Sequence, residues 1–220
     1  YTYGHARRIL IYSPEMKEWL TSNKPNWGSK WQAGDVKYKD LTGEGEVTPG
    51  ASTLENHGDL KRIGNNSPRY RVGLNLDAAW KGIDFSIFFQ GVLKRDWMFD
   101  AGDPYFWGAG SGMWQAACFE EHMDYWTPEN TDAYYPKPYF NETKNQQAQD
   151  AYMQKASYLR CKNIQLGYTL PTHITEKAGI SNCRIYLSCD NLFTITGLSS
   201  VYDPEAFGSY DGYGLSLIHI

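Results

Sequence analysis

The residues best suited to hold an ion lie in the acidic segment 40–46. Four oxygen-bearing residues stand at the ligand spacing of the first half of an EF-hand loop: Asp40, Thr42, Glu44 and Glu46. The second half does not fit, because Ala51 occupies the position where a bidentate carboxylate is required. Weak calcium binding is one interpretation. We favour an acidic turn without metal, and we predict no other cofactor.

The remaining polar residues form no arrangement of the kind that catalysis requires. A glycosidase needs two carboxylates at a fixed separation, and no motif singles out such a pair among Glu120, Glu121, Asp203 and Glu205. Four scattered histidines have no Ser, Cys or Asp arrangement that suggests nucleophilic catalysis: His5, His57, His122 and His173. The cysteines show no metal-site spacing either. The sequence therefore predicts a protein that is not an enzyme.

Aromatic side chains are the third source of binding chemistry, since their rings stack on sugars and pack against partner proteins. Five of them, in a segment without regular periodicity, are candidate ligand-binding residues: Trp97, Tyr105, Trp107, Trp114 and Trp126. The alternative is that these rings form a small core within the loops themselves. We expect most of them to do so and two or three to reach a ligand or a partner.

Residues 70–92 have the pattern of a β-hairpin that is apolar on one face of both arms. Side chains alternate between the faces of a strand, so the apolar residues fall together: Val72, Leu74, Leu76, Trp80, Ile83, Phe85, Ile87 and Phe89. The opposite face carries polar side chains: Arg71, Asn75, Asp77, Asp84 and Gln90. The predicted turn is Lys81-Gly82, and each arm has about 10 residues, the length that a tilted strand needs to cross a bilayer.

Two further strands and a helical turn are predicted at three places: residues 157–170, 183–193 and 172–182. Leu159 and Cys161 lie out of phase with the apolar positions that start at Ile164, so we predict a bulge near Lys162. Elsewhere the sequence predicts a strand over residues 5–12, a helix over 14–21, and loops over 33–69 and 93–155. A loop as long as the last one is usually functional or disordered, and its many aromatics argue against disorder.

The bulk composition narrows the class of protein. A net charge of −4 argues against a general nucleic-acid binder, and no run approaches the ~18 apolar residues of a transmembrane helix. The predicted connections alternate between short and long, as in outer-membrane barrels with short periplasmic turns and long extracellular loops. We therefore predict an all-β fold: several strands of a large antiparallel transmembrane β-barrel with long extracellular loops.

Several segments, in order along the chain, resemble the SusC/RagA-type TonB-linked outer-membrane transporters of Bacteroidetes. The matching segments include Gly34-Asp-Val-Lys-Tyr-Lys-Asp40, Ile63-Gly-Asn-Asn-Ser-Pro-Arg-Tyr70, Phe88-Phe-Gln-Gly91, Lys94-Arg-Asp-Trp97, Asp124-Tyr-Trp-Thr-Pro-Glu-Asn130, Ala156-Ser-Tyr-Leu-Arg160, Asn163-Ile-Gln-Leu-Gly-Tyr-Thr-Leu-Pro171 and Asn191-Leu-Phe-Thr194. Together they extend over most of residues 34–207, which makes the resemblance specific.

The resemblance implies import of glycan or peptide fragments through a plugged barrel in the cell outer membrane. It also implies that TonB supplies the energy through an N-terminal region outside this chain, and that a SusD-like surface lipoprotein forms a lid. The polar face of the hairpin would then line the lumen, and the apolar face would contact lipid. We expect residues 1–214 to be a C-terminal part of the barrel without the plug, and residues 215–220 to be a truncated or non-native tail.

Two other classes of protein share some of these features. A secreted β-sandwich carbohydrate-binding module also has alternating strands and abundant aromatics, but its apolar faces are covered by one another. A SusD-like lid would instead require a helical repeat scaffold, which this strand-rich sequence does not predict.

Overall fold

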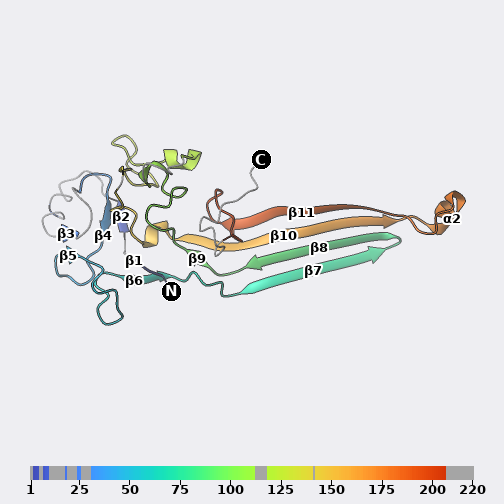
Figure 1. Cartoon of the computed structure of the whole chain (residues 1–220), viewed down its shortest axis with the longest axis horizontal. Helices are drawn as coiled ribbons and strands as arrows, with labels where there is room; N and C mark the ends of the chain where they lie inside the picture. The colour runs from blue at the N-terminus through green and yellow to red at the C-terminus, as the bar shows by residue number, and fades with distance from the viewer. Residues whose placement is uncertain are drawn as a thin grey trace. The chain divides into compact units, whose positions relative to one another are not determined.

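The computed structural model describes residues 2–4, 7–9, 18, 24–25, 31–111, 118–140 and 142–206. The chain divides into two compact units (Figure 1). The strand unit consists of Ser67–Arg95 and Lys155–Ser199. The loop unit consists of Tyr1–Asn66, Asp96–Gln154 and Ser200–Ile220. No helix in the described ranges is long and apolar enough to cross a membrane.

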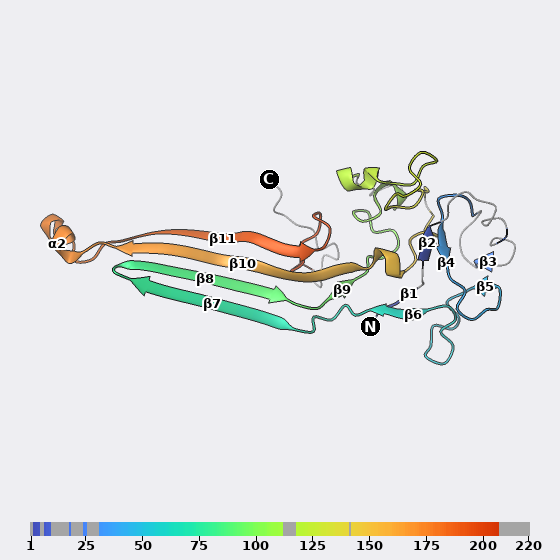
Figure 2. The same cartoon turned by 180° about the vertical axis from the view of Figure 1, so that it is seen from behind.

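Four long antiparallel strands form the sheet of the strand unit: β7 (Arg71–Trp80), β8 (Ile83–Val92), β10 (Gln154–Thr169) and β11 (Arg184–Gly197). Their spatial order is β11-β10-β8-β7, and they run side by side in both views of the molecule (Figures 1 and 2). The sheet is open, with β7 and β11 at its edges among the described strands. The predicted hairpin is confirmed, with its turn at Lys81-Gly82.

The hairpin turn owes its tightness to two residues with positive φ. Lys81 has φ 48° and Gly82 has φ 86°, which is the backbone pattern of a type I′ turn. Such a turn matches the right-handed twist of the two strands, so Trp80 pairs directly with Ile83. The carbonyl of Gly82 also accepts a hydrogen bond of 2.7 Å from the backbone N–H of Thr169, which ties the turn to β10.

The predicted bulge is confirmed and explains the change of phase in β10. Relative to β8, the register shifts between Cys161 and Asn163, so Lys162 is an extra residue in β10. Opposite this point β11 carries two residues, of which Asn191 has φ 51°. Because this bulge interrupts the alternation, the sequence-based end of the strand at Phe193 was wrong, and β11 continues to Gly197.

The connection between β10 and β11 contains the predicted helical turn. It consists of α2 (Thr172–Thr175) followed by the 3₁₀ helix η4 (Glu176–Ala178). Gly179 follows in the left-handed region with φ 70° and ends the turn. This connection and the Lys81-Gly82 turn lie at the same end of the sheet, since Thr169 pairs with Arg184 and bonds Gly82.

One face of the sheet is apolar across all four strands. Leu74 pairs with Phe89, and Leu166 pairs with both Phe85 and Leu187. Leucine side chains on this face remain exposed, by 52% at Leu74 and by 76% at Leu187. A β-sandwich would cover such a face with a second sheet, so the sandwich alternative is not supported.

Cys161 is an exception on the apolar face, because it is fully buried. Its pairing partners on the two neighbouring strands are Phe89 and Phe193, whose ring centroids lie 6.2 Å apart. With this small side chain beside two phenyl rings, Cys161 serves as an apolar packing residue.

The loop unit is built from short elements. Its strands are β1 (Thr2–Gly4), β2 (Arg7–Ile9), β3 (Lys24–Pro25), β4 (Val36–Tyr38), β5 (Glu46–Val47), β6 (Lys61–Gly64) and β9 (Asp96–Trp97). Its 3₁₀ helices are η1 (Gly108–Gly110), η2 (Glu120–Met123) and η3 (Asp150–Tyr152). Three pairs of strands form: β1 with β6, β2 with β4, and β3 with β5.

These short strands correct part of the sequence-based prediction. Residues 33–69 were expected to form only loop, but they contain β4, β5 and β6, whose two to four residues are too few to show a period. Within the predicted strand 5–12 the structure describes only β2, and within the predicted helix 14–21 only Glu18, which is helical. The expected tail 215–220 lies outside the described residues.

Three passages of the chain meet at Gly64 within the loop unit. Asn65 and Asp96 exchange two hydrogen bonds, of 2.9 and 3.0 Å, through the Asn65 carbonyl, the Asp96 carboxylate and both backbone N–H groups. A Cβ at Gly64 would lie 3.0 Å from Cβ of Asp96 and 3.2 Å from the end of the Met153 side chain. The segments that lead into β7, out of β8 and into β10 are therefore held together.

Candidate functional site

The polar face of the strand unit carries the residues that the hairpin pattern assigned to it. The register keeps Arg71, Asn75 and Asp77 on the same face as Asp84 and Gln90, because Asn75 pairs with Phe88 and Asp77 with Ser86. The neighbouring strands extend this face. Gln90 pairs with Arg160 and Asp84 pairs with Gly167.

An ion pair crosses this face from β8 to β11. The Arg184 guanidinium donates two hydrogen bonds to the Asp84 carboxylate, of 3.0 Å from Nε and 2.5 Å from a terminal nitrogen. Gly167 of β10 lies between the two strands, and a Cβ there would come within 2.5 Å of the Asp84 carboxylate and 2.7 Å of the Arg184 guanidinium. The absence of a side chain at Gly167 therefore makes room for the bidentate pair.

Two more side-chain bonds join β10 to β11 on the polar face. Asn163 donates to the Asp190 carboxylate at 2.7 Å, and Nε of Arg160 donates to the Thr194 hydroxyl at 2.8 Å. With the ion pair of Asp84, they form a polar ladder along the sheet. This face is thus suited to water and hydrophilic solutes, in contrast to the apolar face behind it.

In the loop unit, a buried ion pair joins two segments that are far apart in sequence. Nζ of Lys144 lies 3.0 Å from the carboxylate of Asp35, and both side chains are fully buried. Asn145 donates to the same carboxylate at 3.1 Å and accepts a 2.9 Å bond from the Val36 backbone. Lys144 also lies 3.8 Å from the centroid of the Tyr139 ring. Polar partners and an aromatic ring therefore surround the buried ammonium.

Several loop aromatics pack into a core of their own. Phe106 stacks on Phe99 with ring centroids 4.5 Å apart, and Trp107 meets Tyr152 edge-on at 4.9 Å. Their polar atoms are satisfied locally: the indole N–H of Trp107 donates to the Asp100 carbonyl at 3.0 Å. Because these rings are buried against each other, they fix the loops.

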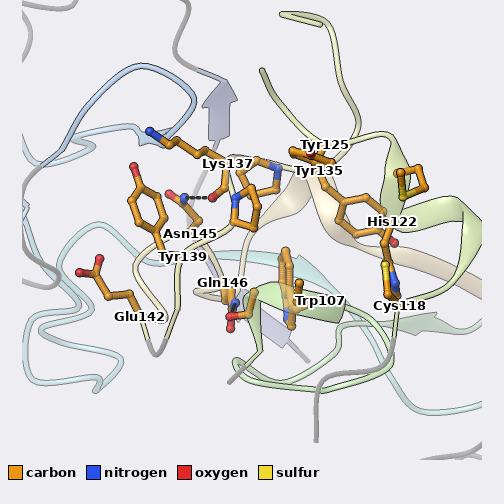
Figure 3. Close-up of a pocket in the computed structure, with 15 residues that line it drawn as sticks. Trp107, Cys118, His122, Tyr125, Tyr135, Lys137, Tyr139, Glu142, Asn145 and Gln146 are labelled. Carbon is orange, nitrogen blue, oxygen red and sulfur yellow. Dashed lines mark hydrogen bonds between the residues drawn. The ribbon is translucent and has the colours of Figure 1, made fainter. Parts of the chain in front are cut away.

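A cavity of about 330 Å³ opens beside this core, and its walls belong to the loop unit (Figure 3). Its labelled lining residues are Trp107, Cys118, His122, Tyr125, Tyr135, Lys137, Tyr139, Glu142, Asn145 and Gln146. Figure 3 shows Tyr139 and Glu142 on one side of the cavity and His122 and Cys118 on the other. The size suits one side chain or one sugar ring of a larger ligand.

The amide groups of Asn145 and Gln146 in the cavity wall are already bonded within the loops, whereas the buried Nε2 of His122 has no hydrogen-bond partner among the described residues. Gln146 accepts from the Gly102 backbone and donates to the Gly110 carbonyl, both at 2.7 Å. Burial raises the pKa of Tyr135, and nearby Glu121 raises it further, so this phenol remains neutral. Burial and Asp35 likewise raise the pKa of Tyr139. The cavity therefore offers ring faces and neutral phenols, together with the side chains of Lys137 and Glu142.

The structure brings only one of the five predicted loop aromatics to this cavity, namely Trp107. Trp126 is buried and packs directly on Gly34, while Trp97 and Tyr105 are half-buried. Trp114 lies outside the described residues. Sequence reasoning missed Tyr135 and Tyr139 of the wall, although the segment Tyr135-Pro-Lys-Pro-Tyr139 gave a signal, since alternating prolines present side chains on a stiff backbone.

The acidic loop uses its carboxylates to bind its own backbone. Asp40 accepts from the N–H groups of Gly43 and Gly45, at 2.6 and 2.9 Å. Burial raises the pKa of Asp40, but these bonds and one from Thr42 outweigh that effect and lower it. The fully buried Asp59 accepts further backbone bonds from the same loop. Among the described residues, no group of three His, Cys, Asp or Glu side chains could hold a metal ion.

Glu44 and Glu46, the other acidic members of the proposed calcium set, are exposed. Thr42 donates its hydroxyl to the Asp40 carboxylate at 3.2 Å. The hydrogen bonds in this loop are those of an acidic turn.

Two curated proteins of Formosa agariphila are similar to the chain. TonB-dependent receptor P3 is 31% identical over 173 residues, which is 79% of this chain and 16% of that protein. TonB-dependent receptor P26 is 25% identical over 172 residues, which is 78% of this chain and 16% of that protein. The chain thus spans about a sixth of the length of these relatives. No family model matches it.

Solved structures of the RagAB peptide transporter have a similar fold. One covers 88% of this chain and 19% of its own, at 22% identity and a TM-score of 0.56. The RagAB peptide importer in the open-open state covers 97% of this chain and 21% of its own, at 21% identity and a TM-score of 0.57.

These similarities agree with the antiparallel sheet, which has one apolar and one polar face, and with the family resemblance of the sequence segments. Both curated relatives are named as TonB-dependent receptors. The chain is therefore similar to TonB-dependent receptors over 79% of its length, and its long antiparallel strands have the fold of the matching part of the RagAB structures.

Proposed function

We propose that this chain forms part of the wall and the extracellular loops of a receptor that imports nutrients across the outer membrane. The observation that carries the proposal is the 31% identity to a TonB-dependent receptor over 79% of the chain. TonB would supply the energy through a region of the protein outside this chain.

The two faces of the strand unit support this role. Outer-membrane barrels turn apolar side chains to lipid and polar side chains to the lumen. We therefore assign the exposed apolar face to lipid and the face with Arg71, Asn75, Asp77, Asp84 and Gln90 to the import pathway. A cargo passing this wall would meet charged and amide groups that already bond one another across strands.

The proposal also concerns the chemical class of the cargo and the protein that covers the barrel as a lid. The similar RagAB proteins are described as peptide transporters, so peptide is one cargo class, and glycan fragments are the other. The aromatic cavity around Trp107 and Tyr135 would bind part of the cargo or a side chain of a SusD-like lipoprotein that covers the barrel. Three of the four remaining predicted aromatics, Trp97, Tyr105 and Trp126, would support these loops.

Cysteine labelling in the full-length receptor, in intact outer membranes, tests the orientation of the faces. Cysteines at Leu74 and Phe85 should react with a lipid-soluble maleimide, and cysteines at Asn75 and Asp84 with a membrane-impermeant one. Labelling in the opposite sense would rule out the barrel orientation.

Energy dependence tests the transport step. Uptake of labelled peptide and oligosaccharide mixtures should stop when TonB is deleted, whereas binding at the cell surface should persist. A plain binding module would show the same surface retention with and without TonB, and would take up neither mixture.

A further inference from the structure

A buried histidine in the wall of the loop cavity has one ring nitrogen without a partner. His122 is only 7% exposed, and it lines the cavity. Its Nε2 is buried and forms no hydrogen bond with any group in the described part of the chain. Leaving a buried polar atom unbonded is costly, so such an atom beside a cavity indicates where a ligand atom would bind.

The other nitrogen of His122 determines what kind of group Nε2 is. Nδ1 accepts a 3.0 Å hydrogen bond from the backbone N–H of Phe119. An accepting ring nitrogen carries no proton, so the proton of this imidazole is on Nε2. Gly108 leaves room for the ring, because a Cβ there would come within 2.7 Å of Nδ1. The cavity therefore holds one preset N–H donor, which requires an acceptor from a ligand.

The wall around this donor is rich in aromatic rings. Tyr135 lies edge-on to His122, with ring centroids 5.3 Å apart. Trp107 and Tyr125 also line the cavity. Aromatic rings favour edge-to-face and offset contacts with one another, so a planar ring is a suitable guest for this wall.

A sugar ring matches the same wall less well. The amides of Asn145 and Gln146 are already bonded within the loops. The charged ends of Lys137 and Glu142 lie on the opposite side of the cavity from His122 (Figure 3). Every buried sugar hydroxyl would need a partner of its own, and His122 supplies one donor. A phenol brings a single oxygen on an apolar ring.

We propose that this cavity, which we name the tyrosine pocket, binds the tyrosine side chain of a peptide ligand. Nε2–H of His122 donates to the phenolic oxygen, and the aromatic wall packs against the ring. The inference rests on the proposed function, because it takes peptide as the cargo, and it adds the side chain that the receptor prefers. His122 distinguishes tyrosine from phenylalanine, since phenylalanine would leave Nε2 unpaired.

Alkylation of Cys118 measures occupancy of the tyrosine pocket, because this exposed thiol also lines the cavity. The purified full-length receptor in detergent is treated with iodoacetamide, and modification of Cys118 is followed by mass spectrometry after digestion. Cys183, in the connection before β11, is the internal reference. The probes are two pentapeptides with a central tyrosine or phenylalanine between glycines, and methyl glucoside.

Half-protection of Cys118 should require at least about fivefold less of the tyrosine peptide than of the phenylalanine peptide, which corresponds to one neutral hydrogen bond. Methyl glucoside should protect least, and the rate at Cys183 should not change. Equal protection by the two peptides, or no protection by either, would overturn the tyrosine pocket. Stronger protection by methyl glucoside would favour a sugar site in its place.

Two substitutions of His122 separate its two nitrogens. Asn carries an acceptor near the position of Nδ1 but nothing at Nε2, so His122→Asn should keep the bond from Phe119 and lose the preference for tyrosine. Gln places an N–H donor near the position of Nε2, so His122→Gln should retain the preference. A full preference in His122→Asn would overturn the role of Nε2. Trypsin resistance of the loops is checked first in both variants.

A second pair of variants tests the aromatic wall. Tyr125→Ala removes a ring from the lining and should weaken protection by both peptides to the same extent. Phe140→Ala is the matched control, because its exposed ring does not line the cavity. Weaker protection in Phe140→Ala but not in Tyr125→Ala would place the peptide outside the tyrosine pocket.

Uptake of the same two peptides by cells with and without TonB separates this inference from the proposed function. TonB-dependent uptake together with equal protection of Cys118 would overturn the tyrosine pocket and leave the proposed function intact. Tyrosine-selective protection without TonB-dependent uptake would overturn the proposed function and leave the pocket as a binding site.

Discussion

The strand unit and the loop unit place polar and apolar side chains in opposite ways. In the strand unit, long backbone ladders carry exposed leucines, and Leu187 is 76% accessible. In the loop unit, Phe106, Trp107 and Tyr152 form a core, and the charges of Lys144 and Asp35 are fully buried. The loop unit thus follows the rules of a water-soluble domain, and the strand unit follows those of a barrel wall in lipid.

The difference shows which interactions stabilise each unit. The sheet satisfies its backbone groups strand by strand, so it tolerates apolar exposure where the surroundings are hydrocarbon. The loops have few ladders and depend instead on specific buried side chains, each with several partners. A mutation in one unit should therefore destabilise that unit and leave the stability of the other unchanged.

The largest effect should follow from breaking the buried ion pair. Lys144→Met leaves the Asp35 carboxylate buried without its cation, a loss of about 3–5 kcal/mol. We expect trypsin to cut the loops of the full-length receptor rapidly in intact membranes, while the barrel remains resistant to SDS at room temperature. Lys39→Met, at an exposed lysine, is the control. Equal protection of both variants would show that the pair does not stabilise the loops.

A charge on the lipid-facing side should affect the strand unit instead. Leu187→Arg should destabilise the membrane-inserted receptor by about 2–4 kcal/mol near the bilayer midplane, whereas the adjacent Ser188→Arg should change it little. Urea titration of the receptor in lipid vesicles measures both. A larger loss for Ser188→Arg would reverse the assignment of the faces, and proteolysis of the loops should be the same in both variants.

A smaller effect is expected from crowding two strands. A Cβ at Gly91 would collide with the Tyr158 carbonyl oxygen on the neighbouring strand, so Gly91→Ala should cost about 1–3 kcal/mol through backbone shifts. Gly73→Ala is the matched change, because its nearest neighbour, the Phe88 ring, lies at an ordinary 3.6 Å. The temperature at which each receptor loses SDS resistance should fall only for Gly91→Ala. A matching fall for Gly73→Ala would contradict the close approach.

The smallest effect concerns the acidic loop and pH. Folding lowers the pKa of Asp40 below its ordinary value of 3.8, so its stabilising bonds are present above that value and are lost as the pH falls through the folded pKa. Amide exchange at Gly43 and Gly45, corrected for intrinsic rates, should therefore accelerate below about pH 4. Asp40→Asn should remove this step, and a step that persists in Asp40→Asn would have another origin.

Much of the strand unit was predictable because its determinants are local. The alternation over residues 70–92 and the pair Lys81-Gly82 specify the hairpin, and the phase change at Cys161 indicates the bulge. The end of β11 was not predictable by alternation, since Asn191 adopts positive φ inside the strand. The two residues at this irregularity, Asn191 and Leu192, interrupt the alternation, and Phe193 and Ile195 then resume the apolar phase of Ile185 and Leu187.

The loop unit was much less predictable, because its partners are distant in sequence. Asn145 and Asp35 are 110 positions apart, and no periodicity links them. The five aromatics were chosen as ligand candidates by residue type and loop position, yet of the four that the structure describes only Trp107 borders the cavity. Burial distinguishes them, and burial depends on the folded arrangement of several loops.

The meeting of three chain passages at Gly64 bears on how the sheet assembles. Residues 93–153 separate β8 from β10, and closing a flexible connection of that length would cost about 3 kcal/mol more entropy than closing a two-residue turn. Because Asp96 and Met153 both pack at Gly64, folding of the loop unit brings the ends of this connection together beforehand. We therefore expect β8 and β10 to pair soon after the loops have folded, at a rate typical of neighbouring strands.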